Sequence, residues 1–444
     1  MTYASAVDRL FALASELAGP PRKYRIEEMQ QLCEALGHPE RSFASILIAG
    51  TNGKGSTAAL LAHILAAAGY RTALYTSPHL EQVNERIRIS NASGELLPIH
   101  DEPFGEAFAK VEAAAVALQH KGELPAPPSF FEAVTATAFV ALSTANIEIA
   151  VLEVGMGGRL DATNVVNPLL SVITDISLDH MEYLGATIDA IAREKAGIIR
   201  ANGILVTLPQ HPAANQVLGE VAVSLNARGV NAAAYIPYLN PKQIGSLNRY
   251  SLSVLDETIH VDLPLSGSHQ QRNLALAIAA AVELRNHYGY KLGPAEITRG
   301  IHSTQWPARL ERILSDTHAD ILIDVAHNPA GAWALRSALS HFDPAPPSMT
   351  LIFSCLRDKA LDEMAQVLFP AFDKVILTQV SSPRAAPLEN LRAAAASIRI
   401  QAAEAPNSEE ALNLALELTP PTGLVVIAGS VYLAGELRSK AMRS

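Results

Sequence analysis

The sequence predicts an α/β fold with a P-loop-type doubly wound parallel sheet, an appended antiparallel hairpin region and a second, smaller Rossmann-like α/β domain. Three observations support this prediction. Short apolar runs of strand type alternate with segments of helical spacing along most of the chain. Residues 46–57 join one such strand to a helix through a glycine-rich turn. From residue 321 a second regular series of strands and helices begins.

The length and composition fit this architecture. A chain of 444 residues can form two domains with sizeable cores, and 49% hydrophobic with 18% charged residues is typical of a packed protein. The net charge of -10, with scattered Lys and Arg, argues against a nucleic-acid surface. Cys33 and Cys355 are too few for a disulfide framework or a cysteine metal site. With neither a secretory signal nor a long apolar run, we expect a cytoplasmic protein without a membrane partner.

The first predicted elements are helices. Residues 3–18 carry apolar side chains at helical spacing and end at Gly19, Pro20 and Pro21. A second short helix is predicted over residues 27–36, closed by Gly37. These helices precede the first strand of the sheet.

The glycine-rich turn has the features of a phosphate-binding loop. It follows the apolar strand 46–48 and contains three glycines within residues 50–55, before a helix that continues to residue 68. Glycines let backbone N–H groups approach phosphate oxygens, Lys54 can reach terminal phosphates, and Ser56 offers a hydroxyl to Mg²⁺. The spacing departs from the strict Walker A pattern, whose first glycine would fall at Ile48. Taken alone, the loop could also be a tight turn without a nucleotide.

Two further strands end in side chains that can bind a metal. The strand over residues 147–154 ends at Glu153, before a glycine-rich loop, and the strand over residues 169–176 leads to His180. Doubly wound sheets bind their ligands at the carboxyl ends of their strands. A lone histidine is more often structural than a ligand. However, Glu153 and His180 together, at the ends of two strands of the same series, favour a shared cation.

The remaining elements before residue 300 alternate in the same way. A strand over residues 72–76 leads to Ser77-Pro78-His79-Leu80, and Ser129 with Glu132 forms a capping box, so that Glu132 could simply cap its helix. Lys195 lies in a helix where a solvated side chain is the ordinary expectation. The other predicted elements are helices 103–120, 129–145, 187–199, 213–227 and 269–287, a strand over 204–208, and a hairpin formed by residues 250–254 and 259–263.

The C-terminal part is predicted to be a separate domain. We expect an N-terminal domain over residues 1–299, a linker over residues 300–307 and a C-terminal domain over residues 308–444. The last domain has no glycine-rich dinucleotide fingerprint, which weakens a dehydrogenase interpretation. Its predicted strands are residues 321–325, 350–353, 374–380 and 424–427, and its predicted helices are near residues 330–341, 360–369, 388–398 and 408–417.

Taken together, the motifs resemble those of bacterial folylpolyglutamate synthases and dihydrofolate synthases, in the ATP-dependent Mur ligase superfamily. The glycine-rich loop alone is typical of Mur ligases in general, whereas the Ser-Pro-His-Leu and Gly-Gly-Arg-Leu-Asp-Ala-Thr-Asn strings are much narrower. Ala308 and Met156 depart from the usual glycine and leucine but remove no functional group. The matching motifs are residues 50–56, 77–80, 85–87, 130–132, 153–164, 178–180, 193–198, 273, 306–311 and 324–329.

The resemblance implies which residues bind ATP and metal. Lys195 matches a lysine that is carbamylated in the family and that could hold a second Mg²⁺, and Lys54, Lys195 and His327 would form the catalytic set. His327 would lie near the incoming glutamate or the phosphates. The implied ATP contacts are Thr51, Asn52, Gly53, Lys54, Gly55, Ser56, Asn273, Arg309 and Asp324, and the implied Mg²⁺ ligands are Ser77, Glu153 and His180.

The resemblance also implies the substrates. An aromatic side chain could stack on a flat pterin ring. The implied pterin and pteroate contacts are Ser129, Phe130, Phe131, Glu132, Leu160, Asp161 and Ala162. A protein of this kind joins L-glutamate to dihydropteroate or to reduced folates through an acyl phosphate, and we expect a monomer. The sequence leaves open whether one or both folate activities are present.

Two other interpretations remain at this point. One is a Mur-type ligase that adds an amino acid to a peptidoglycan precursor, which Phe130-Phe131 and the Ser-Pro-His-Leu string disfavour. The other is a nucleotide-dependent binding protein without catalysis, which the complete set of metal-binding residues disfavours.

Overall fold

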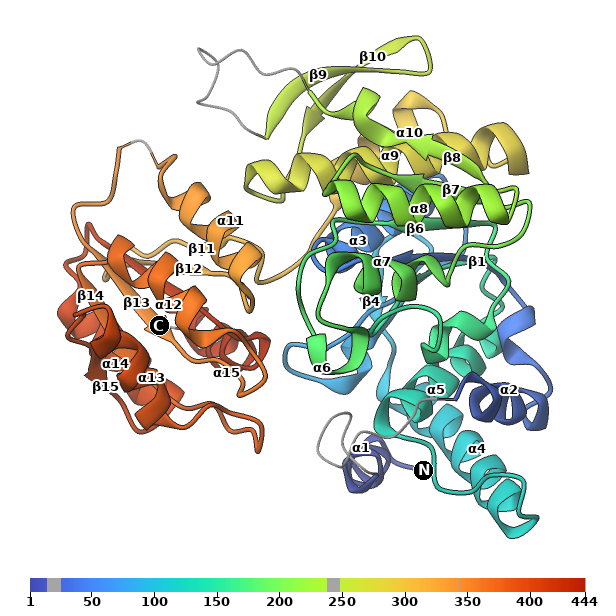
Figure 1. Ribbon diagram of the computed structural model, residues 1–444, viewed down its shortest axis with the longest axis horizontal. Helices are drawn as coiled ribbons and strands as arrows, with labels where there is room; N and C mark the ends of the chain where they lie inside the picture. Colours follow the sequence, from blue (N-terminus) through green and yellow to red (C-terminus); the bar gives the residue numbers. More distant parts are fainter. Residues whose placement is uncertain (14–24, 238–247, 343, 444) are drawn as a thin grey trace.

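The computed structural model describes residues 1–13, 25–237, 248–342 and 344–443. In this part of the chain two parallel-rich sheets are each covered by helices, and the smaller sheet stands beside the larger body (Figure 1). The helix predicted over residues 3–18 is observed as α1 (Tyr3–Ala12), while the rest of that segment, with Gly19-Pro20-Pro21, lies outside the described residues. None of the described helices is long and apolar enough to cross a membrane.

The larger sheet has eight strands, and β1 lies near its centre. Six strands run parallel, and β3 and β4 are added antiparallel at one edge. In spatial order the strands are β4 (Leu96–Pro98), β3 (Ile87–Ser90), β2 (Thr72–Tyr75), β5 (Ile149–Glu153), β1 (Ala44–Ala49), β6 (Leu170–Ile173), β7 (Ile204–Thr207) and β8 (Arg228–Asn231).

The two faces of this sheet pack into different cores. Leu47 and Ala49 of β1 point into one core, and Ile46 and Ile48 point into the other, as the alternation of a strand requires. The first face is covered by α1, α2 (Ile26–Ala35), α4 (Asp101–His120), α5 (Phe130–Thr144), α7 (Ile188–Ala196) and α8 (Pro212–Ser224). The second face is covered by α3 (Lys54–Ala67), α9 (Ser268–Tyr288), α10 (Pro294–Ser303) and a hairpin.

The hairpin confirms the predicted antiparallel pair. Strands β9 (Arg249–Val254) and β10 (Glu257–Asp262) form a separate two-stranded sheet. Its alternating apolar residues are buried in the second core, because one face packs on the helices and the other faces outward.

The smaller sheet has six strands, of which only β11 is antiparallel. Helices α11 (Pro329–Leu339), α12 (Leu361–Leu368) and α13 (Leu388–Ser397) cover one face, and α14 (Ser408–Leu418) and α15 (Val431–Ala441) cover the other. In spatial order the strands are β11 (Glu311–Ile313), β12 (Asp320–Ile323), β16 (Leu424–Ala428), β13 (Met349–Phe353), β14 (Lys374–Leu377) and β15 (Ala403–Glu404).

Several short elements were not predicted. Helix α10 begins with Pro294 at its first turn and a Glu296 cap, so residues 300–303, expected in the linker, form its last turn. A Cβ on Gly300 would lie 2.3 Å from the Cα of Ile64, so this turn packs tightly on α3. Helix α15, the edge strands β4, β8, β11 and β15, and the short helix α6 (Met181–Leu184) were also not predicted.

Candidate active site

Both sheets turn strand ends toward one cleft of about 790 Å³. Its walls come from the loop after β1, the ends of β5 and β6, the start of α9, and the ends of β12 and β16. Of the residues singled out from the sequence, the cleft is lined by Thr51, Asn52, Gly53, Lys54, Gly55, Ser56, Ser77, Phe131, Glu132, Glu153, Leu160, Asp161, Ala162, His180, Lys195, Asn273, Arg309, Asp324 and His327.

The glycine-rich loop leaves the N-terminus of α3 open toward this cleft. Gly53 has a φ of +87° and stands at the N-cap of α3 without a side chain to cap it. A Cβ there would lie 2.2 Å from Oδ1 of Asn273, so the position requires glycine for space as well as for conformation. The N–H groups of Thr51 and Asn52 donate to the Asp175 carbonyl, which fixes the loop against the end of β6. An uncapped helix N-terminus can receive an anion.

Lys54 and Glu153 face each other beside this helix end. Lys54 Nζ lies 4.0 Å from Glu153 Oε1 and donates to the Thr51 carbonyl at 3.2 Å. Glu153 is 5% exposed, and burial raises the pKa of its carboxyl group while the charge of Lys54 opposes that shift. Glu153 Oε2 accepts the backbone N–H of Ser77 at 3.1 Å. The carboxylate of Glu153 therefore links the loop of Ser77 to Lys54 at the end of the phosphate loop.

His180, the third predicted metal ligand, lies in the segment between β6 and α6. Its backbone is left-handed, with a φ of +49°, and it stands at the N-cap position of the short helix α6 without a side-chain cap. Burial, together with the charge of Lys359, lowers the pKa of His180 to about 4. The imidazole is then neutral near pH 7, which is the form that binds metals. Across the described ranges, no group of three or more His, Cys, Asp and Glu side chains is arranged to hold a metal ion.

Lys195 is buried beneath the phosphate loop, contrary to the solvated position that is ordinary for a helical lysine. It is 4% exposed and its Nζ donates to the Gly50 carbonyl at 2.7 Å. Burial, with a smaller contribution from the charge of Lys54, lowers the pKa of Lys195 to about 7. A large fraction of this amine is therefore neutral, and hence nucleophilic, near pH 7.

The two adjacent aromatic residues of α5 lie in different environments. Phe131 lines the cleft and packs on Gly155, where a Cβ would lie 2.5 Å from the ring. Phe130 is 5% exposed and lies between the Arg86 guanidinium, 5.1 Å from its centroid, and the Phe11 ring at 5.4 Å. The structure therefore brings Phe131, but not Phe130, to the cleft wall.

The polar residues near these aromatics also hold local structure. Glu132 Oε2 accepts the N–H of Ser129 at 2.7 Å, so the capping box is confirmed, and Ser129 stays out of the cleft wall. Asp161 Oδ2 accepts the N–H of Met156 at 2.9 Å, and burial raises the pKa of this carboxyl group. Both acidic side chains line the cleft while organising the loops that carry them.

The C-terminal sheet contributes Arg309 and Asp324 to the opposite wall. Asp324 accepts the N–H groups of Leu310 at 2.9 Å and Ala326 at 2.8 Å, and burial raises the pKa of its carboxyl group against the charge of Arg309. Asn273 of α9 is held by Gln270, at 2.8 Å. The predicted nucleotide contacts therefore lie on both sides of the cleft.

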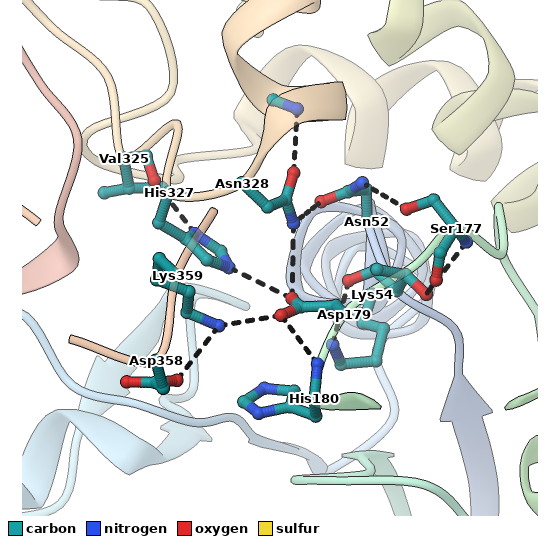
Figure 2. A network of polar contacts seen from close by, with 12 residues as sticks. Asn52, Lys54, Ser177, Asp179, His180, Val325, His327, Asn328, Asp358 and Lys359 are labelled. Carbon is teal, nitrogen blue, oxygen red and sulfur yellow. Dashed lines mark hydrogen bonds and ion pairs between the residues drawn. The ribbon is translucent and has the colours of Figure 1, made fainter. Parts of the chain in front are cut away.

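A polar network that sequence reasoning missed crosses the cleft (Figure 2). Asp179 accepts hydrogen bonds from Lys359 Nζ at 2.8 Å and from Asn328 Nδ2 at 3.3 Å, and His327 Nε2 lies 3.9 Å from it. Although burial favours the neutral acid, the neighbouring His180 and Lys359 hold the pKa of Asp179 well below its usual range. The position of Asp179 next to His180 and of Asn328 before a helix-starting proline were available signals, but Lys359 had none.

Comparisons with known proteins agree with this geometry. Models of two protein families match the chain: the Mur ligase middle domain over residues 104–281 and the Mur ligase glutamate ligase domain over residues 308–431. The chain is 37% identical to folylpolyglutamate synthase of Lacticaseibacillus casei, with 92% of each chain covered. It is 35% identical to dihydrofolate synthase/folylpolyglutamate synthase of Mycobacterium tuberculosis, with 93% of this chain and 89% of that protein covered.

Solved structures are similar over the whole chain. The structure of Mycobacterium tuberculosis folylpolyglutamate synthase complexed with ADP superimposes with a TM-score of 0.85 at 33% identity, covering 100% of this chain and 98% of that one. The structure of Escherichia coli FolC in complex with DHPP and ADP has a TM-score of 0.84 at 27% identity, covering 100% and 99%.

Proposed function

The chain belongs to the folylpolyglutamate synthase/dihydrofolate synthase family of Mur ligases, and from that premise we propose that it joins L-glutamate to dihydropteroate, to folates or to both. ATP phosphorylates the acceptor carboxylate to an acyl phosphate. The amine of L-glutamate then attacks the acyl carbon, the new C–N bond forms, and inorganic phosphate leaves. A peptidoglycan ligase is not supported, because relatives over nearly the whole length are named for folate ligation.

One observation carries this proposal most strongly. The open N-terminus of α3, Lys54 and Glu153 face the same cleft as Arg309 and Asp324 of the C-terminal sheet. Transfer of a phosphoryl group needs positioning and positive charge more than covalent chemistry from the protein. A site enclosed from two sides also keeps water from an acyl phosphate, which would otherwise hydrolyse.

The residues around the cleft divide by role. Lys54 offsets charge on the transferring phosphoryl group, and His327, whose pKa is lowered to about 4 by burial and by Lys359, is a neutral imidazole near the phosphates or the incoming glutamate. Phe131 is the ring that can stack on the pterin. We assign ATP to Thr51, Asn52, Gly53, Lys54, Gly55, Ser56, Asn273, Arg309 and Asp324, and the pteroate to Phe131, Glu132, Leu160, Asp161 and Ala162, without Ser129 and Phe130, which do not line the cleft.

We assign Mg²⁺ to Ser77, Glu153 and His180. The donor set fits: Glu153 is a buried carboxylate beside the phosphate loop, the loop of Ser77 is bonded to it, and His180 is neutral. When bound, the ion would polarise the phosphate oxygens and offset their charge. Glu153→Gln should raise the Mg²⁺ concentration needed for half-maximal activity, and an unchanged requirement would argue against Glu153 as a ligand.

We further propose that Lys195 is carbamylated. Its neutral amine adds to CO₂, a C–N bond forms, and the nitrogen loses a proton, which leaves an anionic carbamate able to hold a second Mg²⁺. The lowered pKa of Lys195 supports this step, because only the neutral amine reacts. Mass spectrometry of the native protein should detect the added group, and an unmodified amine far from metal would reject the carbamate.

The domain boundaries and the assembly state are proposed as well. We place the N-terminal domain at residues 1–303 and not 1–299, because residues 300–303 form the last turn of α10, the linker at residues 304–307 and the C-terminal domain at residues 308–444, supported by the two separate parallel-rich sheets and by the family match that starts at residue 308. We also propose a monomer. Size-exclusion chromatography with light scattering tests this, and a dimer mass would reject it.

A single assay tests the function. The protein is incubated with ATP, Mg²⁺, L-glutamate and either dihydropteroate or tetrahydrofolate, and phosphate release is followed. We expect release that requires both glutamate and at least one pterin substrate, and the two arms reveal whether one or both activities are present. A peptidoglycan precursor in place of the pterin is the control. Phosphate release that occurs only with the peptidoglycan precursor would overturn the proposal. The absence of phosphate release with both pterin substrates would overturn it as well.

A further inference from the structure

The network around Asp179 joins the two sheets at the point where the predicted metal ligand His180 leaves the larger one. Asp179 follows β6, and its Oδ1 accepts both the backbone N–H of His180 at 2.9 Å and Nζ of Lys359 at 2.8 Å. Lys359 comes from the segment between β13 and α12 of the smaller sheet. One carboxylate oxygen thus bonds to the backbone of His180 and to a side chain from across the cleft (Figure 2).

Asn328 connects the same carboxylate to the phosphate loop. Its Nδ2 donates to Oδ2 of Asp179 at 3.3 Å and to Oδ1 of Asn52 at 2.9 Å. Its Oδ1 accepts the N–H of Gly331 at 2.8 Å, which caps α11 and fixes the amide in this orientation. Asn328 is 2% exposed, so no water competes freely for these bonds.

The ion pair at the centre is shielded from solvent. The side chain of Lys359 is 6% exposed and that of Asp179 is 11% exposed. If the smaller sheet moved away, Asp179 would lose Lys359, whereas Lys359 would keep the neighbouring Asp358, whose Oδ2 lies 3.6 Å from its Nζ. The carboxylate of Asp179 would then lose the charge-assisted hydrogen bond that holds it in this orientation, so its orientation depends on Lys359. His180 depends on that orientation, because its left-handed backbone is bonded to the same oxygen.

We propose that Asp179 is a positioning residue that makes the alignment of His180 depend on docking of the C-terminal sheet, while Asn328 makes the position of the phosphate loop depend on the same docking. Through Lys359 the docked sheet orients the carboxylate that holds the His180 backbone, and through Asn328 it holds Asn52. The metal site and the phosphate loop are thus aligned only when the cleft is closed on both sides. The inference rests on the proposed role of His180 as a Mg²⁺ ligand.

A double-mutant cycle between Asp179→Asn and Lys359→Met tests the coupling. Each single variant should lower kcat by about 10- to 100-fold and raise the half-saturating Mg²⁺ concentration by about 10-fold, because displaced neighbours of a metal ligand weaken the site by this order. ADP affinity measured without Mg²⁺ should stay within about twofold. The double variant should be no worse than the poorer single one, since both remove the same interaction.

Multiplicative effects in the double variant would overturn the proposal, because Lys359 would then act on a substrate independently of Asp179. An unchanged Mg²⁺ requirement in both single variants would overturn it as well. Arg392→Met is the matched control: it removes the cation of an ion pair with Glu404 within the smaller sheet, and it should leave kcat and the Mg²⁺ requirement unchanged.

Hydrogen–deuterium exchange gives a readout that needs no catalysis. Lys359→Met lies in the other domain, yet it should speed exchange of backbone amides in residues 176–186, whereas Arg392→Met should not. Equal exchange in that segment for both variants would reject the coupling. The wild-type phosphate-release assay and the Mg²⁺ requirement of His180→Ala test the proposed function separately, so failure of the function and failure of the coupling give different results.

Discussion

Three helices that follow parallel strands of the two sheets begin differently, although residues at the start of each line the same cleft. Helix α3 follows β1 and starts after Gly53 without any side-chain cap. Helix α11 follows β12, and the Asn328 side chain accepts the N–H of Gly331; helix α15 follows β16, and Ser430 accepts the N–H of Tyr432 at 3.1 Å. Of these three helix ends, only that of α3 has no side-chain cap.

This difference explains how two similar sheets can serve different purposes. A capped helix start is satisfied internally and holds its neighbours in place. An uncapped start with glycine at positive φ offers N–H groups and a positive partial charge to an anion. The larger sheet therefore supplies the phosphate site, and the smaller sheet supplies rigid polar groups that close it.

The strongest test of this difference between the two sheets is the contribution of Lys54 to catalysis. Lys54→Ala should lower kcat/KM for ligation by about 100- to 1,000-fold, because it removes the cation beside the open helix end where phosphoryl charge develops. Phosphate release measures the effect, and circular dichroism should show an unchanged fold. Full activity in a folded variant would contradict the role of the uncapped end.

The buried lysines on the two sides of the cleft give a second test. Lys195 donates to a carbonyl, whereas Lys359 faces a carboxylate. The pKa of Lys195 falls from 10.5 to about 7, so between these pH values the unfolded chain binds more protons than the folded one. Stability of the wild type relative to Lys195→Met should therefore rise with pH over this window, by at most about 1.4 kcal/mol per pH unit.

Urea unfolding of both proteins at several pH values between 7 and 9 measures this trend, in CO₂-free buffer without Mg²⁺ so that the amine stays unmodified. The full destabilisation from the buried charge is present below pH 7. Lys121→Met, at an exposed position, controls for the change of side chain. A stability difference that does not vary with pH would contradict the prediction.

Filling the open helix end should have a smaller effect. In Gly53→Ala the added Cβ would meet Asn273, and an alanine at a φ of +87° is strained by about 1–2 kcal/mol, so ADP affinity should fall by about 10-fold. Calorimetric titration with ADP measures this. Gly219→Ala in α8, where nothing lies within 4 Å of the added atom, is the control. Equal ADP affinity in both variants would show that the shape of the loop is not limiting.

Removing a cap from the smaller sheet should have the smallest effect and should act on stability. Ser430→Ala should lower the free energy of unfolding by about 1 kcal/mol, with a much smaller loss of ADP affinity than Gly53→Ala causes. Asn407→Ala, which removes the cap of α14, should cost a similar amount. If Ser430→Ala lowered the affinity for ADP as much as Gly53→Ala does, the proposed division of roles between the two sheets would be wrong.

Most of the regular fold followed from local patterns. Apolar runs predicted the central strands of both sheets, and alternating residues predicted the β9–β10 hairpin. Helix α10 was missed although Pro294 and Glu296 mark its start, because the segment before Trp306-Pro307 was interpreted as a linker. Helix α15 was missed although Ser430 precedes apolar residues at helical spacing.

The site was predictable where it depends on strand ends. Parallel strands finish at one edge, so the loop after β1 had to lie beside Glu153, and register pairs Ile48 with Glu153. The choice between Phe130 and Phe131 was not predictable. Neighbouring residues of a helix with 3.6 residues per turn point in different directions, and only packing decides which one faces the cleft.

The sequence by itself determined the family, the two sheets and the open phosphate loop, because strand alternation, helical spacing and glycine conformation act over a few residues. Only the tertiary structure decided that Lys195 is buried, that Phe131 and not Phe130 lines the cleft, and that Asp179 meets Lys359, 180 residues away along the chain. The physical reason is that burial and ion pairing depend on how the two sheets dock, and no local pattern of residues encodes that docking.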